Sequence, residues 1–351
     1  MKNVLYVVED ENSPQFRYRV KNLREAVEGD TRWGIEYVLK KDALNRDLTK
    51  YDLIVILRQT SKDGKLLDLI KKLQNAGIKV LFDLDDSVFD YKQAMLIKKS
   101  VREKNIFYWI GYIWGIRRVA KKVDGFICTN EFLANKLKRS FGKPVKIIPN
   151  SLNRRQVEVS EKYIARGEKN HKGFVVGYFS GSPTHAKDFA LVEPELLKFL
   201  EAHENAKLMV VGHMRFSNKM KEWIHSGRVE VLELVDYLKL QRLIAEVDVN
   251  IAPLLVNDFT NCKSELKFFE AAAVETTTIA SSTYAFKKAI ADGKNGFLAE
   301  PGEWYDKLEY LYQHPEENRK IALAAKKYAL KHYYGKEFLE EVEAAYDYFA
   351  K

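Results

Sequence analysis

The stretch KSELKFFEAAAVETTTIASS, Lys263 to Ser282, runs from a polar helix start through an apolar helix body into a β-branched strand. Spacings of four and then three residues place Lys263, Lys267 and Glu270 on one face of this helix, with Lys263 in the opening turn. That turn attracts anions, because its backbone N–H groups are free and the helix dipole is positive there. We therefore expect the lysines to bind a phosphate and the carboxylate to accept hydrogen bonds from a ribose diol. A surface helix with i,i+4 charge pairs is the alternative.

Short apolar runs alternate with helical stretches along the chain, the pattern that builds parallel sheets covered by helices. In the first half, strands are expected at residues 3–8, 51–57, 79–84, 125–129 and 145–149. In the second half, they are expected at residues 174–180, 206–212, 228–234, 248–254, 276–282 and 296–300. The sequence thus predicts an α/β fold of two Rossmann-like, doubly wound parallel-sheet domains facing a cleft.

The two predicted domains are residues 1–155 and residues 170–334, and a C-terminal helix at 335–351 is expected to pack back on the first domain. Residues 151–172 are polar and poor in apolar side chains, which makes them the predicted linker. Further helices are expected at residues 66–76, 106–123, 131–141, 316–332 and 336–350, with a change of direction at residues 332–337.

Composition narrows the class of protein. A chain of 351 residues with 46% hydrophobic content is long enough for two domains, each with a core of its own. The apolar start is short enough to be a strand rather than a signal peptide, and no apolar run approaches the roughly 20 residues of a membrane span. Cys128 and Cys262 lie far apart without metal-ligand spacing, so neither a disulfide framework nor a zinc site is expected. A cytoplasmic protein fits this composition.

The formal net charge of +9 indicates affinity for anions: nucleotides, phosphorylated lipids, acidic membrane surfaces or nucleic acid. Between Lys92 and Lys122 the basic side chains are opposed only by Glu103. Within this stretch, IFYWIGYIWGIRRVAKKV brings Trp109, Tyr112, Ile113 and Ile116 onto one helical stripe. The stripe suits a core helix, and it also suits a helix that rests on an anionic membrane or grips a lipid-linked acceptor. A nucleic-acid surface is disfavoured, because no recognition helix or aromatic strand platform accompanies the charge.

In doubly wound sheets, ligands bind outside the carboxyl ends of the strands, so the residues that follow strands are candidate site residues. In the first half these are Arg58, Asp85, Asp86, Asn130 and Asn150, and in the second half they are residues 181–185, Gly212 and His213. The loop SGSPTH, residues 180–185, could cradle a phosphate with its backbone N–H groups, although a plain turn with a Ser or Thr helix cap explains it equally well.

FDLDDSVFD, residues 82–90, contains an Asp-x-Asp that could ligate a divalent metal. We prefer turn and helix-cap roles for Asp85 and Asp86, because nothing nearby completes an oxygen cage. Two other functions are disfavoured by missing motifs. A response-regulator receiver needs an aspartate where Leu57 and Arg58 stand, and a nicotinamide dehydrogenase needs a glycine fingerprint that neither half carries.

Several stretches, taken in order, resemble motifs of the retaining GT-B glycosyltransferases, the family that contains sucrose synthase and many bacterial polysaccharide transferases. They are FDLDDSVFD, VDGFICTNEFLANKL, VKIIPNSLN, VGYFSGSPTHAKDF, VDVNIAPL, KSELKFFEAAAVETTTIASS and DGKNGFLAE. The resemblance covers almost the whole chain and is greatest to an O-antigen and capsule branch of the family.

The resemblance implies a glycosyltransferase that binds a nucleotide-sugar donor mainly in the C-terminal domain and a glycan or lipid-linked acceptor in the N-terminal domain. It implies retention of anomeric configuration, no bound metal and no cofactor. In the mechanism usual for the family, the leaving phosphate itself helps to deprotonate the incoming hydroxyl. A role in cell-surface polysaccharide synthesis at the inner face of the membrane is expected, with residues 92–122 as the membrane contact. A two-lobed binding protein for nucleotide sugars or phosphosugars, without turnover, is the alternative.

By position in the motifs, Glu270 resembles the glutamate that binds the ribose, and Lys267 with Lys263 would neutralise the diphosphate. Cys262 stands where the family usually has a first, sugar-binding glutamate, and Glu265 or Asn261 is the candidate replacement. The residues that follow strands and the resemblance together give three sets of candidate site residues. The catalytic set is Lys267, Glu265 and Lys263; the donor-binding set is Glu270, Gly181, Ser182, Thr184, His185, Lys187, Gly212, His213, Leu234, Val235, Ser264 and Leu266; the acceptor-side set is Arg17, Arg19, Arg58, Asp85, Asp86, Asn130 and Asn150.

Overall fold

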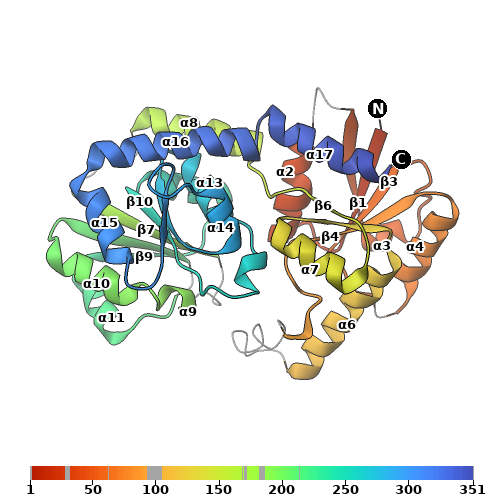
Figure 1. Ribbon diagram of the computed structural model, residues 1–351, viewed down its shortest axis with the longest axis horizontal. Coiled ribbons are helices and arrows are strands. Elements are labelled where there is room, and N and C mark those ends of the chain that lie inside the picture. The colour runs from red at the N-terminus through yellow and green to blue at the C-terminus, as the bar shows by residue number, and fades with distance from the viewer. Residues whose placement is uncertain are drawn as a thin grey trace. The chain divides into compact units, whose positions relative to one another are not determined.

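The computed structural model describes residues 2–27, 32–61, 63–92, 105–167, 169, 172–181, 186–212 and 214–350. The chain forms two compact units. The first comprises Met1–Arg154, Asn261–Ser264 and Tyr333–Lys351, and the second comprises Arg155–Thr260 and Glu265–His332. Each unit contains a six-stranded parallel sheet flanked by helices (Figure 1). This is the α/β class with two doubly wound sheets that the sequence predicts.

The sheet of the first unit has the strand order β2-β1-β3-β4-β5-β6, so the order reverses direction between β1 and β3. Its strands are β1 (Lys2–Val8), β2 (Trp33–Leu39), β3 (Leu53–Leu57), β4 (Lys79–Leu84), β5 (Gly125–Cys128) and β6 (Val145–Ile147). Its helical segments are α1 (Pro14–Phe16), the π-helical turn η1 (Arg17–Lys21), α2 (Asn22–Ala26), α3 (Lys40–Ala43), α4 (Lys65–Asn75), α6 (Ile106–Lys122), α7 (Glu131–Phe141) and α17 (Lys336–Phe349).

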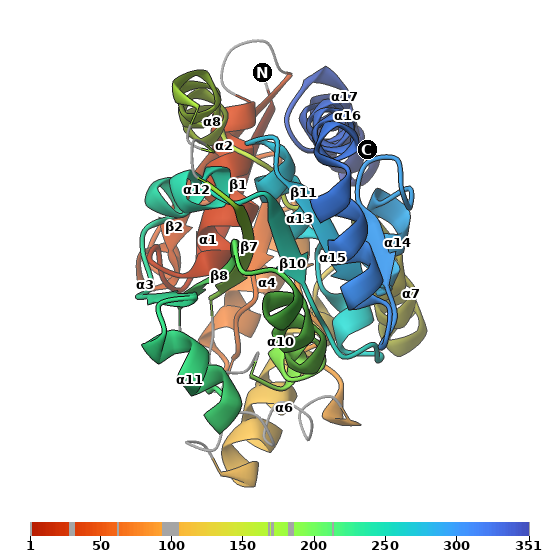
Figure 2. The same cartoon turned by 90° about the vertical axis from the view of Figure 1, so that its left-hand side faces the viewer.

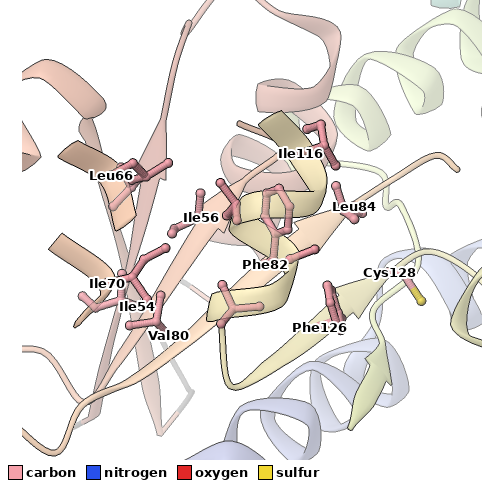
Figure 3. Packing of buried hydrophobic residues seen from close by; sticks show 14 of the residues in the cluster. Ile54, Ile56, Leu66, Ile70, Val80, Phe82, Leu84, Ile116, Phe126 and Cys128 are labelled. Carbon is pink, nitrogen blue, oxygen red and sulfur yellow. The ribbon is translucent and has the colours of Figure 1, made fainter. Parts of the chain in front are cut away.

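Apolar side chains cover both faces of this first sheet, as expected for strands that are buried on both sides. On one face, β3, β4 and β5 pack against α4 and α6, with Phe82 and Phe126 near the centre (Figure 3). The other face packs against α17 through Phe338, Val342 and Tyr346. The C-terminal helix therefore completes the first unit, as predicted.

The sheet of the second unit has the order β12-β11-β10-β7-β8-β9, which reverses direction between β7 and β10 (Figure 2). Its strands are β7 (Phe174–Ser180), β8 (Ala206–Gly212), β9 (Val229–Leu232), β10 (Val249–Ala252), β11 (Thr277–Ser281) and β12 (Phe297–Ala299). Its helices are α8 (Arg154–Arg166), α9 (Ala186–Phe189), α10 (Glu193–Ala202), α11 (Asn218–His225), α12 (Tyr237–Ala245), α13 (Leu266–Ala272), α14 (Tyr284–Ala289), α15 (Trp304–Gln313) and α16 (Pro315–Tyr333), and the 3-10 turn η3 (Thr260–Cys262) precedes α13.

Two predictions about elements need correction. No strand is predicted from the sequence at residues 33–39, where β2 lies at the sheet edge with only Trp33, Ile35 and Val38 buried. The predicted linker at 151–172 is also wrong over most of its length, because α8 occupies Arg154–Arg166. The buried side chains of α8 are the polar Gln156 and Ser160, so this helix lacks the apolar stripe by which helices are usually recognised.

Candidate active site

Helix α13 lies at the point of the second sheet where the strand order reverses. The Nδ2 of Asn250 in β10 donates to the backbone oxygen of Lys267 (3.1 Å) and to Oγ1 of Thr278 in β11 (3.0 Å). These bonds fix the first turn of α13 against the carboxyl half of the sheet. In doubly wound folds the crevice at such a reversal point is the usual ligand site, so α13 stands where a ligand of this unit is expected.

Lys267 is directed towards the neighbouring strand of the reversal point. Its Nζ lies 4.7 Å from the centroid of the Tyr178 ring in β7, a cation–π distance, and is shielded from solvent. Burial raises the pKa of the Tyr178 hydroxyl, so the ring remains neutral and keeps its π electrons available to the ammonium group. A lysine ammonium held in a solvent-poor position interacts strongly with a phosphate, because screening by water is weak there.

Glu270 follows Lys267 by one turn of α13 and is only 4% exposed. Its Oε1 accepts from Nε2 of Gln156 on α8 (3.4 Å), and its backbone oxygen accepts from Nε2 of Gln241 on α12 (2.6 Å). The two glutamine side chains are themselves joined by a 2.9 Å hydrogen bond. Tyr178, Asn250, Gln156 and Gln241 were not predicted from the sequence, because isolated polar or aromatic residues within helices and strands carry no local signal.

The sequence predicted Lys263 in the opening turn of the helix, but the structure places Lys263 before the helix begins. Helix α13 begins at Leu266, and the preceding residues Asn261–Ser264 belong to the first unit. There the backbone oxygens of Asn261 and Lys263 accept from Nδ2 of Asn130, at 3.3 and 3.1 Å. Of the three residues predicted to share one face of the helix, only Lys267 and Glu270 therefore lie on α13.

Cys262 is fully buried in the hydrophobic core of the first unit, where Cys128 also lies. Burial raises the pKa of Cys128 to about 12. A glutamate at position 262, as expected from the family pattern, would bury its carboxylate in this apolar core. The desolvation of that charge disfavours glutamate at this position. Of its candidate replacements, Asn261 lies in the first unit, whereas Glu265 is a buried side chain at the N-cap position of α13.

Other predicted donor residues lie at the same edge of the second sheet. Gly181 follows β7, and Gly212 ends β8 with a left-handed φ of 101°. A Cβ at Gly212 would stand 1.9 Å from the backbone oxygen of Ser180 and 3.1 Å from Cδ2 of Leu234, so the close approach of two strands requires glycine here. Leu234 and Val235 follow β9, and Leu234 is exposed. Lys187 is an exposed residue of α9, and Leu266 is the half-buried first residue of α13. Ser264 is also half-buried but belongs to the first unit. Ser182, Thr184, His185 and His213 lie outside the described residues.

In the first unit, a group of charged side chains lies where β3 and β4 end. Arg58 pairs through Nη1 with Oδ1 of Asp85 (3.0 Å), and its Nε donates to the hydroxyl of Tyr112 on α6 (3.3 Å). Burial alone would lower the pKa of Arg58, but Asp85 together with Tyr112 and Asp86 raises it. Burial raises the pKa of Asp86, an effect that the charges of Lys263 and Arg58 oppose. The structure thus brings Arg58, Asp85, Asp86 and Lys263 together at the carboxyl edge of this sheet, the edge at which doubly wound folds usually bind ligands.

The backbone of Arg58 has φ = 34°, a conformation that L-residues with bulky side chains rarely adopt. Strain of this kind persists only where surrounding contacts enforce it, and it concentrates at functional sites. Here the contacts are the ion pair to Asp85 and the bond from the Arg58 backbone N–H to the oxygen of Asp83 (3.0 Å). Arg58 is therefore held in one orientation at the end of β3.

Three residues of the predicted acceptor-side set, Arg19, Asn150 and Asn130, are buried and hydrogen-bonded within the fold. Arg19 is fully buried, pairs with the equally buried Asp83 at 3.0 Å, and donates to the oxygen of Ile148 and to Oδ1 of Asn150. Asn130 caps α7 through Leu133 N–H (2.9 Å). These side chains stabilise the fold, because a buried arginine needs a carboxylate and oxygen acceptors around it.

Arg17 is half-buried at the start of η1, and its guanidinium lies 3.9 Å from the centroid of the Tyr18 ring. The two carboxylates of the predicted Asp-x-Asp motif, Asp83 and Asp85, each pair with an arginine. Among the described residues, no group of three or more His, Cys, Asp or Glu side chains is arranged to hold a metal ion.

The predicted aromatic stripe of α6 faces mainly inwards. Ile113 and Ile116 are buried, and Tyr112 contacts Arg58. A different set of apolar side chains, Phe107, Ile110 and Trp114, is exposed. The part of the chain that the structure describes contains no helix long and apolar enough to cross a membrane.

Residues 173–314, which include β7 to β12 and α13, match the family model described as glycosyl transferases group 1. The second unit carries a glycosyl transferases group 1 domain. Lys267 and Glu270 both lie within this domain. No curated protein matches the chain closely enough to be counted as a relative.

Solved structures extend the similarity beyond the glycosyl transferases group 1 domain. HepE of Anabaena, in complex with UDP, is 15% identical with a TM-score of 0.64, and the match covers 99% of this chain and 100% of that one. Sucrose-phosphate synthase of Thermosynechococcus elongatus is 13% identical with a TM-score of 0.64, covering 99% of both chains. WaaG, a glycosyltransferase involved in lipopolysaccharide biosynthesis, is 12% identical with a TM-score of 0.61, again covering 99% of both chains. The chain therefore has the GT-B fold over its whole length.

Proposed function

We propose that this protein transfers a sugar from a nucleoside-diphosphate sugar to a glycan or lipid-linked acceptor. The observation that carries the proposal is the placement of Lys267 and Glu270 on α13, at the reversal point of the sheet and within the glycosyl transferases group 1 domain. A buried ammonium and a buried carboxylate one turn apart match the two polar ends of a nucleoside diphosphate. We take UDP-sugars as the first donors to test, because Anabaena HepE was solved with UDP and with UDP-glucose.

In the proposed reaction, the bond between the anomeric carbon and the diphosphate oxygen breaks, and the acceptor hydroxyl forms the new bond on the same face of the sugar. The electron pair of the broken bond goes to the β-phosphate, and the acceptor proton moves to a phosphate oxygen. Lys267 stabilises the charge that develops on this phosphate, which is the electrostatic form of catalysis. Glu270 accepts hydrogen bonds from the ribose and fixes the donor. The reaction needs no protein nucleophile and no bound metal.

We further propose that the product belongs to a cell-surface polysaccharide such as an O-antigen or capsule, and that the enzyme works in the cytoplasm. On the acceptor side, the cluster of Arg58, Asp85 and Asp86 offers charged donors and acceptors to a polyhydroxylated substrate. Retention would be read from the anomeric configuration of the product by NMR. Unchanged turnover in the presence of EDTA would support the absence of a metal requirement.

The decisive experiment is replacement of Lys267 by Ala, with release of the nucleoside diphosphate as the readout. Loss of one preorganised donor to a developing oxyanion costs about 3–4 kcal/mol, so kcat should fall about 100- to 1,000-fold. The matched control is Lys287→Ala, an exposed lysine of α14 in the same unit, which should leave turnover unchanged. Equal turnover of Lys267→Ala and wild type would remove the mechanism. Donor binding without release of nucleoside diphosphate, across a panel of acceptors, would instead support a binding protein.

A further inference from the structure

Two buried glutamines, Gln156 of α8 and Gln241 of α12, lie against the turn of α13 that carries Glu270. Their exposed fractions are 0% and 1%. A glutamine side chain carries both a donor and an acceptor, so its burial is costly unless it forms hydrogen bonds. These two bond to each other and to Glu270, the residue proposed to bind the ribose of the donor. The glutamine pair therefore belongs to the immediate surroundings of that carboxylate.

The end of α13 explains why a glutamine stands on the facing helix α12. Helix α13 ends two residues after Glu270, so the backbone oxygen of Glu270 is one of the last four of the helix, which lack partners in a regular helix. The N–H of Val274, four residues after Glu270, bonds to the oxygen of Ala271 instead (3.1 Å). Nε2 of Gln241 donates to the oxygen of Glu270 at 2.6 Å. Gln241 is thus held with its amide nitrogen towards α13.

The orientation of both amide groups follows from this bond. A backbone oxygen can only accept, so Gln241 turns its nitrogen towards α13 and its own oxygen towards Gln156. Gln156 must then present its nitrogen to that oxygen, at 2.9 Å. The same nitrogen lies 3.4 Å from Oε1 of Glu270, and an amide nitrogen has two hydrogens, one for each of these oxygens. The backbone of Glu270 therefore determines, through two side chains, that its carboxylate faces a donor.

We propose that Gln156 and Gln241 are positioning residues that hold the Glu270 carboxylate in the orientation that binds the ribose. This role rests on the proposed function and adds two residues to it. A side chain that is ordered before the ligand arrives loses less conformational entropy on binding, which raises affinity. A carboxylate has about four acceptor positions, so a bond from Gln156 does not exhaust its capacity to accept from a ribose diol. Both glutamines act through Glu270 and need no contact with the nucleotide.

A purely structural role of the glutamine pair makes a different prediction. If the two side chains only satisfy each other inside the unit, their loss weakens α13 as a whole and reduces the affinity for every ligand of the site. If they position Glu270, their loss reduces the affinity only for ligands with ribose hydroxyls. UDP and 2′,3′-dideoxy-UDP differ in those hydroxyls alone, so the two ligands separate the two roles.

The test is isothermal titration calorimetry of the full-length protein with both ligands. Gln156→Met keeps the length of the side chain and removes the donor. It should bind UDP about tenfold more weakly than wild type does, and bind 2′,3′-dideoxy-UDP as wild type does. Gln241→Met should also lose affinity for UDP, and the double variant should lose little more than either single variant, because the two residues act in one chain of bonds. In turnover, KM for the donor should rise while kcat stays unchanged, since the ribose contact is the same in the ground state and the transition state.

The matched control is Gln313→Met on α15, a glutamine of the same unit whose Nε2 also donates to a glutamate, Glu309 (2.5 Å). It should change neither affinity. Circular dichroism checks that each variant is folded, and Gln241→Met provides an independent test if Gln156→Met is not.

Two results would overturn the positioning role: equal weakening of both ligands by the folded glutamine variants, or unchanged binding of UDP by both of them. Failure of the proposed function itself looks different, because wild type would then bind no nucleoside diphosphate. A wild type that binds UDP, together with Glu270→Gln that loses it and glutamine variants that keep it, would remove the positioning role and leave the transferase in place.

Discussion

Glu270 is the residue on which donor selection depends in the proposed function. Its carboxylate is buried, and hydrogen bonds to a charged acceptor contribute about 1.5–3 kcal/mol. Replacement of Glu270 by Gln keeps the size of the side chain but removes the charge, so affinity for UDP, or for the nucleotide the protein prefers, should fall about 10- to 100-fold. Isothermal titration calorimetry measures this change directly.

A double-mutant cycle with the ligand separates a ribose contact from a general loss of structure. Wild type should bind 2′,3′-dideoxy-UDP about as weakly as Glu270→Gln binds UDP. Glu270→Gln should bind 2′,3′-dideoxy-UDP only slightly more weakly still, because the contact between carboxylate and ribose is already lost when one partner is removed. If the deoxy ligand loses the same affinity with both proteins, Glu270 does not touch the ribose.

Substitutions at position 262 test whether the family pattern or the packing of the local core determines which residue is tolerated there. Replacement by Glu restores the residue expected from the family but places a carboxylate in the apolar core of the first unit. We expect this variant to lose about 3 kcal/mol or more of its free energy of unfolding, and to gain no activity. Cys262→Ala, the control, should lose about 1–2 kcal/mol, because it leaves only a small cavity. Urea unfolding measures both, and a stable Cys262→Glu with raised turnover would contradict the placement.

Sequence periodicity predicts the relative positions of residues correctly when they lie in the same helix, and incorrectly when one of them lies outside it. Lys267 and Glu270 keep their predicted spacing because both lie in α13. Lys263 was misplaced because the chain returns to the first unit at Asn261–Ser264, a tertiary event that no local pattern reports. The burial of Arg19 could not be predicted for a related reason: its buried partner Asp83 is distant in sequence.

Among the structural elements, strands β7 and β8 meet so closely at their carboxyl ends that Gly212 is required. Gly212→Ala would force the strands apart or strain the backbone, and should cost about 2–4 kcal/mol of the free energy of unfolding. Gly181→Ala is the control, since a Cβ there would meet no atom within 4 Å. It should leave stability unchanged in thermal unfolding. Equal stability of the two variants would show that the approach of Ser180 to Gly212 is not a constraint.

Most of the fold follows from the sequence, because strands buried on both faces read as continuous apolar runs. Every described strand except β2 overlaps a predicted range, and α7 begins and ends where expected. β2 was missed because an edge strand buries only part of its surface. The misreading of α8 has a similar origin, since its inward side chains are glutamine and serine. Apolar pattern therefore identifies the central strands and can miss elements that bury only part of their surface or bury mainly polar side chains.

For the molecule as a whole, the first unit is built from parts that are far apart in the chain, and α17 is its last part. Val342 of α17 is fully buried against the first sheet, where Tyr346 also bonds to the hydroxyl of Tyr6 (3.0 Å). Val342→Asp places an unpaired charge there, which should destabilise this unit by about 3–5 kcal/mol. Hydrogen exchange should then lose protection in β1 and β3 but keep it in β7 and β8, because each unit has a core of its own. Glu340→Ala, on the exposed side of α17, should change neither unit, and equal loss in both units for Val342→Asp would show that they unfold as one.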